Sequence, residues 1–382
     1  MANAFVIGPA KSGTTLLISL LDNHPQLSTI PLEIKYYEHY YNTLKHTASY
    51  ELLNRFFLSE SKLRFLDPKN CNQTDLMNSG HIGFSRVDFP KLKEIMDSKA
   101  IEYNELSGRH QILAQYIIDL HRAYSQSLGE SPKQGFAIKE GNHGLPYLDL
   151  IKQDFQNAKF IVMVRDPRDM YSSFKIIHNL NKSEKSYPSF FALNISILNY
   201  LFSNTSADLY SKSCTGYMDY FKNIEASDNV LFLRYEDLVG NTRLEMTKVA
   251  EFLRINFAET MLAPTTAGNI WGGNASSKKK FDKIIKSRRK KWLSLLTKQE
   301  VLLIEYFLAD YFVKYGYQRS LNTISKFNCI FSIRPAHFGR PDVNWKDFLR
   351  PYFRIARYLV RSGGLVYSIA RRMVKTNDTQ NV

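Results

Sequence analysis

Short, almost wholly apolar runs alternate with stretches of helical apolar spacing as far as residue 254. Runs of this length that are rich in Val, Ile and Phe predict buried β-strands. The predicted strands are Phe5–Ile7, Gln26–Ile30, Gly135–Lys139, Lys159–Val164 and Val230–Tyr235. Strands that alternate with helices predict a parallel sheet whose strands are joined by right-handed crossovers.

Helical spacing fills the segments between these strands, and residues 36–130 are mainly helical in pattern. The expected helices are Leu16–Leu21, Asn104–Leu128 (the clearest), 146–156, a helix from Pro167, 188–223 and 242–254. We therefore predict an α/β, P-loop-like three-layer fold, with a central parallel sheet of about five strands and helices on both faces. In such sheets ligands bind at the carboxyl ends of the strands.

The segment after the first strand has the composition of an anion-binding loop. Gly8 and Gly13 bound a loop that contains Lys11, and a helix follows, so free N–H groups and the positive end of the helix dipole converge there. A Walker A loop has the same glycine spacing but places its lysine directly after the second glycine, where this chain has Thr14. The internal lysine therefore favours a phosphate binder that is not an ordinary ATP- or GTP-hydrolysing enzyme.

A second cluster follows the strand that ends at Val164. Arg165 leaves the strand end, and Ser173 lies about two helical turns further on. A guanidinium and a hydroxyl at this spacing are suited to hold one phosphate from two sides. The alternative is a local role, in which Asp166 and Asp169 cap the next helix and Arg165 pairs with one of them.

The net charge of +15 favours anionic partners such as nucleotides, sulfated or phosphorylated glycans, or acidic membrane. The sequence contains no recognisable nucleic-acid-binding module, so nucleic acid is not an expected partner. Cys71, Cys214 and Cys329 form no closely spaced pair and no metal-ligand cluster, which indicates reduced thiols. With no signal-peptide pattern and no apolar stretch long enough to span a bilayer, a cytoplasmic location is expected.

Taken together, the two clusters resemble those of sulfotransferases that use 3′-phosphoadenosine-5′-phosphosulfate (PAPS) as sulfuryl donor. The first loop resembles the family's 5′-phosphosulfate loop, with Ala10 where many members have proline. The resemblance implies a phosphosulfate site formed by Lys11, Ser12, Gly13, Thr14 and Thr15. It extends over about residues 5–318, the usual extent of one large domain.

The same resemblance implies where the rest of the donor binds. Arg165 and Ser173 match the 3′-phosphate site, and Tyr235 begins a Y-E-D-L segment whose tyrosine lies near the adenine. Trp271–Ser277 and the basic residues after it resemble the loop that closes over PAPS, so contacts to the donor are expected from Ser276, Ser277 and Lys278. For Tyr235 and Trp271 the alternative is ordinary packing.

The resemblance also implies the catalytic roles, and no metal is required. Lys11 would stabilise the leaving oxygen, Lys139 would contact the transferred sulfate, and Glu33 would accept the acceptor's proton. The alternatives are an exposed edge lysine at Lys139 and an exposed carboxylate at a helix start for Glu33. Histidine is the base in the small-molecule branch of the family, and the candidates are His39, His81, His110 and His143, none of which lies in a matching motif.

We predict a sulfotransferase domain over residues 1–320 and a basic, partly amphipathic extension over 321–382. The extension is compatible with lying on an anionic membrane, as a peripheral contact, or with packing on the body or on a second subunit. The predicted function is sulfuryl transfer from PAPS to a hydroxyl of a carbohydrate, glycolipid or related small-molecule acceptor. The alternatives are a nucleotide-dependent kinase on the same fold and a non-catalytic nucleotide- or glycan-binding protein.

Overall fold

The computed structural model describes residues 3–44, 49–67, 69, 84–103, 111–141, 144–181, 224–270, 284 and 289–320. The chain divides into two compact units. The first comprises Met1–Asn181 and Asp219–Leu295, and the second comprises Lys182–Met218 and Leu296–Val382. The candidate site lies in the first unit, and each unit is described by itself.

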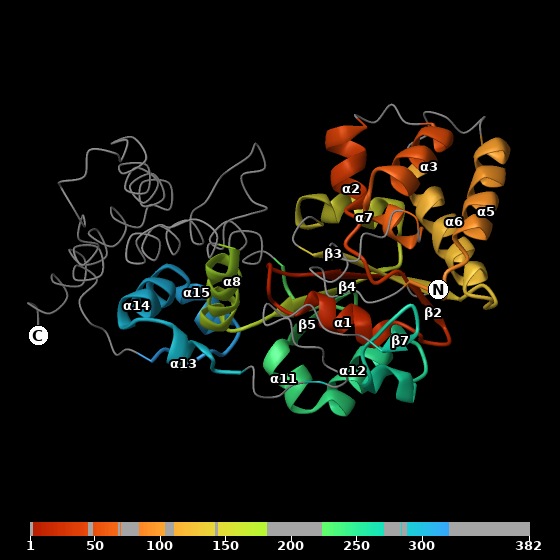
Figure 1. Ribbon diagram of the computed structural model, residues 1–382. Coiled ribbons are helices and arrows are strands. Elements are labelled where there is room, and N and C mark those ends of the chain that lie inside the picture. The colour runs from red at the N-terminus through yellow and green to blue at the C-terminus, as the bar shows by residue number, and fades with distance from the viewer. Residues whose placement is uncertain are drawn as a thin grey trace, which may run out of the picture. The chain divides into compact units, whose positions relative to one another are not determined.

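A five-stranded parallel sheet forms the centre of the first unit (Figure 1). Its strands are β1 (Asn3–Ile7), β2 (Leu27–Thr29), β3 (Gly135–Gly141), β4 (Ala158–Val164) and β5 (Val230–Arg234), in the order β2-β3-β1-β4-β5. The predicted parallel α/β sheet is confirmed. Because β1 lies in the middle, the loops after β1, β3 and β4 meet at one edge of the sheet.

The helices of the first unit are α1 (Thr14–Leu21), α2 (Tyr36–Glu38), α3 (Tyr50–Ser59), α5 (Phe89–Glu102), α6 (Ile112–Ser127), α7 (Leu148–Asp154), α8 (Pro167–Asn181), α11 (Tyr235–Gly240), α12 (Thr242–Leu253) and α13 (Trp292–Leu295). The shorter elements are a π-helix (His39–Thr43), 3₁₀ turns (Lys62–Leu66, Leu145–Tyr147, Glu259–Leu262) and the hairpin strands β6 (Thr265–Thr266) and β7 (Asn269–Ile270). The predicted helices at the start, from Pro167 and at 242–254 are confirmed by α1, α8 and α12.

Several predicted boundaries differ from the structure. The helix expected at 146–156 forms as a 3₁₀ turn followed by α7. Tyr235 begins α11 instead of ending β5, because acidic residues in the first turn, Glu236 and Asp237, favour a helix start there. The predicted start of α6 at Asn104 and the predicted helix at 188–223 lie outside the described residues.

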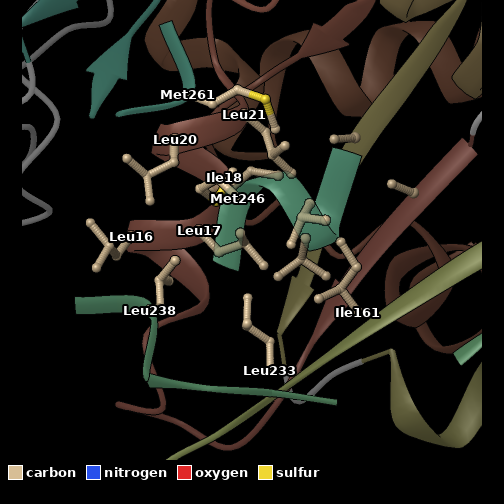
Figure 2. Close-up of a cluster of buried hydrophobic side chains, with 14 of the residues drawn as sticks. Leu16, Leu17, Ile18, Leu20, Leu21, Ile161, Leu233, Leu238, Met246 and Met261 are labelled. Atoms are coloured by element: carbon tan, nitrogen blue, oxygen red, sulfur yellow. The ribbon is translucent and has the colours of Figure 1, made fainter. Parts of the chain in front are cut away.

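Helix α1 is buried along its whole length, and all eight of its residues are inaccessible to solvent or nearly so. Its leucines pack between the sheet and the pair α11 and α12, with Ile161 and Leu233 on one side and Leu238 and Met246 on the other (Figure 2). A helix that is buried on every side is held by contacts all around it. The loop that leads into α1 is therefore held rigidly relative to β1.

The opposite face of the sheet is covered by α6 and α7 (Figure 1). Phe5 of β1 packs there against Phe160 of β4, with ring centroids 5.7 Å apart, and Phe136 of β3 packs on His121 of α6 at 4.9 Å. Because both faces are buried at the centre of the sheet, β1 and β4 read as nearly continuous apolar runs rather than as an alternation of apolar and polar residues. This is why they were visible in the sequence.

The described part of the second unit consists of α14 (Lys298–Phe307), α15 (Ala309–Lys314) and their flanking residues. A capping box between Thr297 and Glu300 fixes the start of α14. Among all helices that the structure describes, none combines the length and the apolar character that crossing a bilayer requires.

Candidate active site

The loop between β1 and α1 is a tight turn that departs from ordinary backbone conformations at three residues. Gly8, Lys11 and Gly13 have φ values of 155°, 70° and 106°. The Ser12 N–H donates to the Pro9 carbonyl at 3.0 Å, and the Gly8 N–H donates to the carbonyl of Gly141 at the end of β3, at 3.1 Å. The loop is thus closed on itself and tied to the neighbouring strand.

Glycine at position 13 is required by packing as well as by its φ. A Cβ at Gly13 would lie 2.5 Å from Cδ2 of Tyr235. The Arg165 guanidinium carbon lies 4.2 Å from the centroid of the same Tyr235 ring, and Arg165 Nη1 donates to the Lys11 carbonyl at 2.9 Å. The structure therefore brings together Gly13, Lys11, Arg165 and Tyr235, four of the predicted site residues.

The side chains of the loop present polar groups that the described residues leave without partners. The Ser12 hydroxyl is fully buried and has no hydrogen-bond partner among the described residues. The Lys11 ammonium makes no ion pair within the described part of the chain. Burial lowers its pKa, Lys139 and Arg165 lower it further, and Glu33 opposes them. A desolvated ammonium beside an orphaned hydroxyl at a helix N-terminus fits an anionic ligand.

Lys139, in β3, connects this loop to Glu33. Its ammonium donates to Thr15 Oγ1 at 2.9 Å and lies 3.0 Å from Glu33 Oε2. Glu33 stands in the connection from β2 to α2, and its side chain remains 19% exposed. Gly141 has a φ of 57°, and a Cβ there would lie 2.9 Å from Glu33 Oε1, so the bend after β3 makes room for the carboxylate.

At the start of α8 the predicted cap at Asp166 is confirmed, whereas the phosphate-binding role of Arg165 and Ser173 stays a prediction. Asp166 caps the helix by accepting from the Arg168 N–H at 2.9 Å, as the local interpretation predicts, and it also pairs with the Arg168 guanidinium at 2.7 Å. Asp169 instead accepts from the N–H groups of Lys290 and Trp292, at 2.8 and 3.1 Å. Arg165 is directed to the Lys11 carbonyl and the Tyr235 ring.

Ser173 lies on α8, and its hydroxyl donates to the carbonyl of Asp169 at 3.0 Å. This bond uses the hydroxyl proton and leaves the oxygen lone pairs. Three other predicted donor contacts, Ser276, Ser277 and Lys278, lie outside the described residues, as does the loop that contains them.

His39, the candidate histidine that the structure describes, does not join this cluster. His39 packs against the rings of Phe56 and Phe57, with centroids 5.1 and 6.3 Å apart. The other three, His81, His110 and His143, lie outside the described residues. Among described residues, Glu33 is thus the predicted base that contacts another predicted site residue.

The sequence interpretation missed Glu140, which follows Lys139 in β3. Its side chain is fully buried, and Oε1 accepts from the Tyr36 N–H at 3.2 Å. Burial raises its pKa to about 8, and the neighbouring carboxylates Glu33 and Glu38 raise it as well. The available signal in the sequence was an acidic residue within a buried strand. Its contact with the Tyr36 N–H could not be predicted, because that contact forms only when α2 packs over β3.

Comparisons with known proteins found a family match and matches among solved structures. The model of the Sulfotransferase family matches residues 3–259. Among solved structures, the sulfotransferase domain of a Synechococcus olefin synthase is 22% identical, covers 81% of this chain and 94% of its own, and has a TM-score of 0.46. A Mycobacterium avium sulfotransferase is 13% identical, with 84% and 78% covered and a TM-score of 0.40.

A retinol dehydratase in complex with retinol and PAP (adenosine 3′,5′-bisphosphate) is 14% identical, with 84% of this chain and 83% of that chain covered and a TM-score of 0.35. Among the curated proteins, none matches the sequence.

Proposed function

The chain belongs to the sulfotransferase family, and from that premise we propose that it transfers a sulfuryl group from PAPS to a hydroxyl of a carbohydrate, glycolipid or related acceptor. The observation that carries the proposal is the position of the Lys139 ammonium, which contacts Thr15 in the first turn of α1 and Glu33 at the same time. One cation therefore joins the group that would bind the donor to the group that would deprotonate the acceptor.

The donor site in this proposal consists of two anion sites on either side of Tyr235. The loop that contains Lys11, Ser12, Gly13 and Thr14 would bind the phosphosulfate, because N–H groups and a buried ammonium are directed there. Arg165 and Ser173 would hold the 3′-phosphate, and Ser276, Ser277 and Lys278 would add contacts from the loop that follows β7. The Tyr235 ring, already packed between Gly13 and Arg165, would border the adenine.

PAPS supplies the sulfuryl group together with a leaving phosphate. The bond between sulfur and the bridging phosphate oxygen breaks, a bond between sulfur and the acceptor oxygen forms, and the hydroxyl proton moves to Glu33. Lys11 and Lys139 would stabilise the charge that develops on the leaving and transferred oxygens, and no metal is required for this step. Glu33 is ion-paired and hence ionised, which is the state that accepts a proton.

The proposed acceptor class is inferred from the residue that would act as the general base. A carboxylate in contact with Lys139, together with a His39 that is packed among phenylalanines, supports the glycan-type arrangement over the histidine type. The net charge of +15 supports an anionic or polar acceptor. The sequence contains no recognisable nucleic-acid-binding module, so nucleic acid is not proposed as the acceptor. The basic extension 321–382, which lies outside the described residues, would provide any peripheral membrane contact of a cytoplasmic enzyme.

The test is transfer of labelled sulfate from PAPS to a panel of glycans, glycolipids and small hydroxyl compounds, with chelator present. We expect metal-independent transfer and binding of PAP. Glu33→Gln should lower kcat by about 100-fold or more, the usual effect of removing a general base, while PAP affinity stays within about twofold. Glu94→Gln, which removes an exposed carboxylate on α5, is the control.

Each alternative function has its own outcome. A requirement for Mg²⁺ and ATP would indicate a kinase. PAP binding without turnover, and without any effect of Glu33→Gln, would indicate a binding protein. Failure to bind PAP would overturn the proposal.

A further inference from the structure

Glu140 is the one fully buried acidic side chain among the residues that the structure describes, and it stands beside a residue of the proposed catalytic site. Its Oε1 accepts from the Tyr36 N–H at 3.2 Å, and its Oε2 has no hydrogen-bond partner among the described residues. The surroundings are closed, since a Cβ at Gly144 would lie 2.6 Å from the Glu140 Cβ. Burying a carboxyl group with one oxygen unpaired costs free energy, which indicates that Glu140 has a role at this position.

The segment that Glu140 contacts is the one that carries Glu33. Between β2 and α2, buried and partly exposed residues alternate, with Ile34 and Tyr36 in the interior and Glu33 and Lys35 on the outer side. Lys35 has a φ of 61°, a conformation that is costly for a residue other than glycine. This strained turn persists because its neighbours on both sides are anchored, Ile34 and Tyr36 by burial and the Tyr36 N–H by Glu140.

Two consecutive residues of β3 therefore hold the same segment at two points. Lys139 contacts the carboxylate of Glu33, and Glu140 contacts the backbone three residues further along. We propose that Glu140 is a positioning residue, which sets the place of the Glu33 carboxylate by holding the turn at Lys35 and Tyr36. The proposal rests on the proposed function, because it assigns Glu33 as the base.

The charge state of Glu140 fits this role. The pKa is raised to about 8, chiefly by burial; the Glu33 and Glu38 carboxylates act in the same direction, and the Tyr36 N–H and Lys35 oppose them. Near neutral pH the group is thus a neutral acid, which holds the Tyr36 N–H without placing a second negative charge beside the base. Among the described residues, the buried phenols of Tyr36 and Tyr37 also face it.

The experiment compares Glu140→Leu and Glu140→Gln with the wild-type chain in the labelled-PAPS assay. Glu140→Leu removes the acceptor for the Tyr36 N–H and should lower kcat by about tenfold or more, as small displacements of a catalytic group do. PAP affinity should stay within about twofold, since Glu140 contacts none of the proposed donor residues. Glu140→Gln keeps an acceptor of the same shape and should recover kcat to within about threefold at pH 7.

The pH profile separates positioning from a purely structural role. Ionisation of Glu140 above about pH 8 changes the charge beside Glu33, so the pH profiles of kcat for the wild type and for Glu140→Gln should diverge there. Deprotonation of Lys11 lowers activity in both proteins, and their difference isolates Glu140. Glu245→Ala, which removes a buried carboxyl on α12, should leave kcat unchanged.

Two outcomes would overturn the proposal: wild-type kcat in Glu140→Leu, or coincident pH profiles for the wild type and Glu140→Gln. If Glu140→Leu does not fold, as judged by circular dichroism, the pH profiles alone decide. A wild-type protein that binds PAP but transfers nothing would instead refute the proposed function, so the two failures are distinguishable.

Discussion

The two sides of the candidate site are built differently. On the donor side, the β1–α1 loop is shaped by backbone conformation and close packing, with Tyr235 against Gly13 and Arg165 against the Tyr235 ring. On the acceptor side, Glu33 is held by titratable groups, the Lys139 ammonium and, through the backbone, the buried acid Glu140. The donor side therefore depends on shape and the acceptor side on charge.

Under the proposed function, the difference follows from what each side has to do. A phosphate or phosphosulfate is a permanent anion, and fixed N–H groups at a helix N-terminus bind it without any change of protonation. Deprotonating a hydroxyl requires a group that changes its charge, and the environment must set when it does so. Substitutions on the donor side should thus act through stability and affinity, and those on the acceptor side through rate and pH dependence.

Substitution of Lys11 should give the largest effect on activity, because Lys11 belongs to both sides. Its backbone forms part of the loop, and the charges of Lys139 and Glu33 act on its ammonium. We expect Lys11→Ala to lower kcat by about 100- to 1000-fold, comparable to the loss of one oxyanion-stabilising donor. Single-turnover transfer of labelled sulfate measures this. Lys91→Ala, on the exposed face of α5, is the control. Equal losses of PAP affinity and kcat would assign Lys11 to donor binding alone.

Gly13→Ala should come next, and it should act on stability. The new Cβ would combine a left-handed backbone with a 2.5 Å approach to the Tyr235 ring, so we expect a loss of about 3 to 4 kcal/mol in the free energy of unfolding. Gly129→Ala is the matched control, because Gly129 has a φ of 74° but no atom within 4 Å of a Cβ. It should cost only about 1 kcal/mol, the backbone contribution alone. Denaturant unfolding measures both, and equal losses would show that the Tyr235 contact is dispensable.

The donor side could be predicted from the sequence because its signals are local. The strand, the glycine-bounded loop and α1 are contiguous, and Arg165 follows its strand directly. The buried apolar strands also predicted the five-stranded parallel sheet. Tyr235 was identified through the resemblance to the sulfotransferases, although its contact with Gly13 depends on β5 and α11 folding against the loop.

The acceptor side could be predicted only in part, because its contacts join distant segments. Glu33 and Lys139 were named through the resemblance, but nothing in the sequence indicates that they form an ion pair. The contact of Glu140 with the Tyr36 N–H exists only in the folded chain and has no signal in the sequence. The hairpin of β6 and β7 was missed for the same reason. Its turn is anchored by Asp22, at the end of α1, which accepts from Thr265 Oγ1 at 2.7 Å and from the Gly268 N–H at 2.9 Å.

The pH dependence of stability tests the charge of the acceptor side. The pKa of Glu140 is about 8 in the folded protein and near the ordinary glutamate value of 4.5 in the unfolded chain. Between these values the native state keeps a proton that the unfolded state has lost, so the free energy of unfolding falls as pH rises. From pH 5 to pH 8 the wild type should lose about 3 kcal/mol more than Glu140→Gln, because a difference of one bound proton changes stability by about 1.4 kcal/mol per pH unit. Urea unfolding at both pH values measures this, and parallel losses would contradict it.

The smallest effect is expected on the donor side, at Ser173. Ser172 and Ser173 are neighbours on α8, and each hydroxyl donates to the carbonyl four residues before it. Ser172 is buried, whereas Ser173 is partly exposed and is the proposed ligand of the 3′-phosphate. Ser173→Ala should weaken PAP binding by about fivefold, the contribution of one hydrogen bond near 1 kcal/mol. Ser172→Ala loses the same internal bond and should leave PAP affinity unchanged. Isothermal titration of PAP into the two variants measures the difference. If both bind PAP as the wild type does, the 3′-phosphate is held by Arg165 and the backbone, and the donor side depends even less on single side chains than we propose.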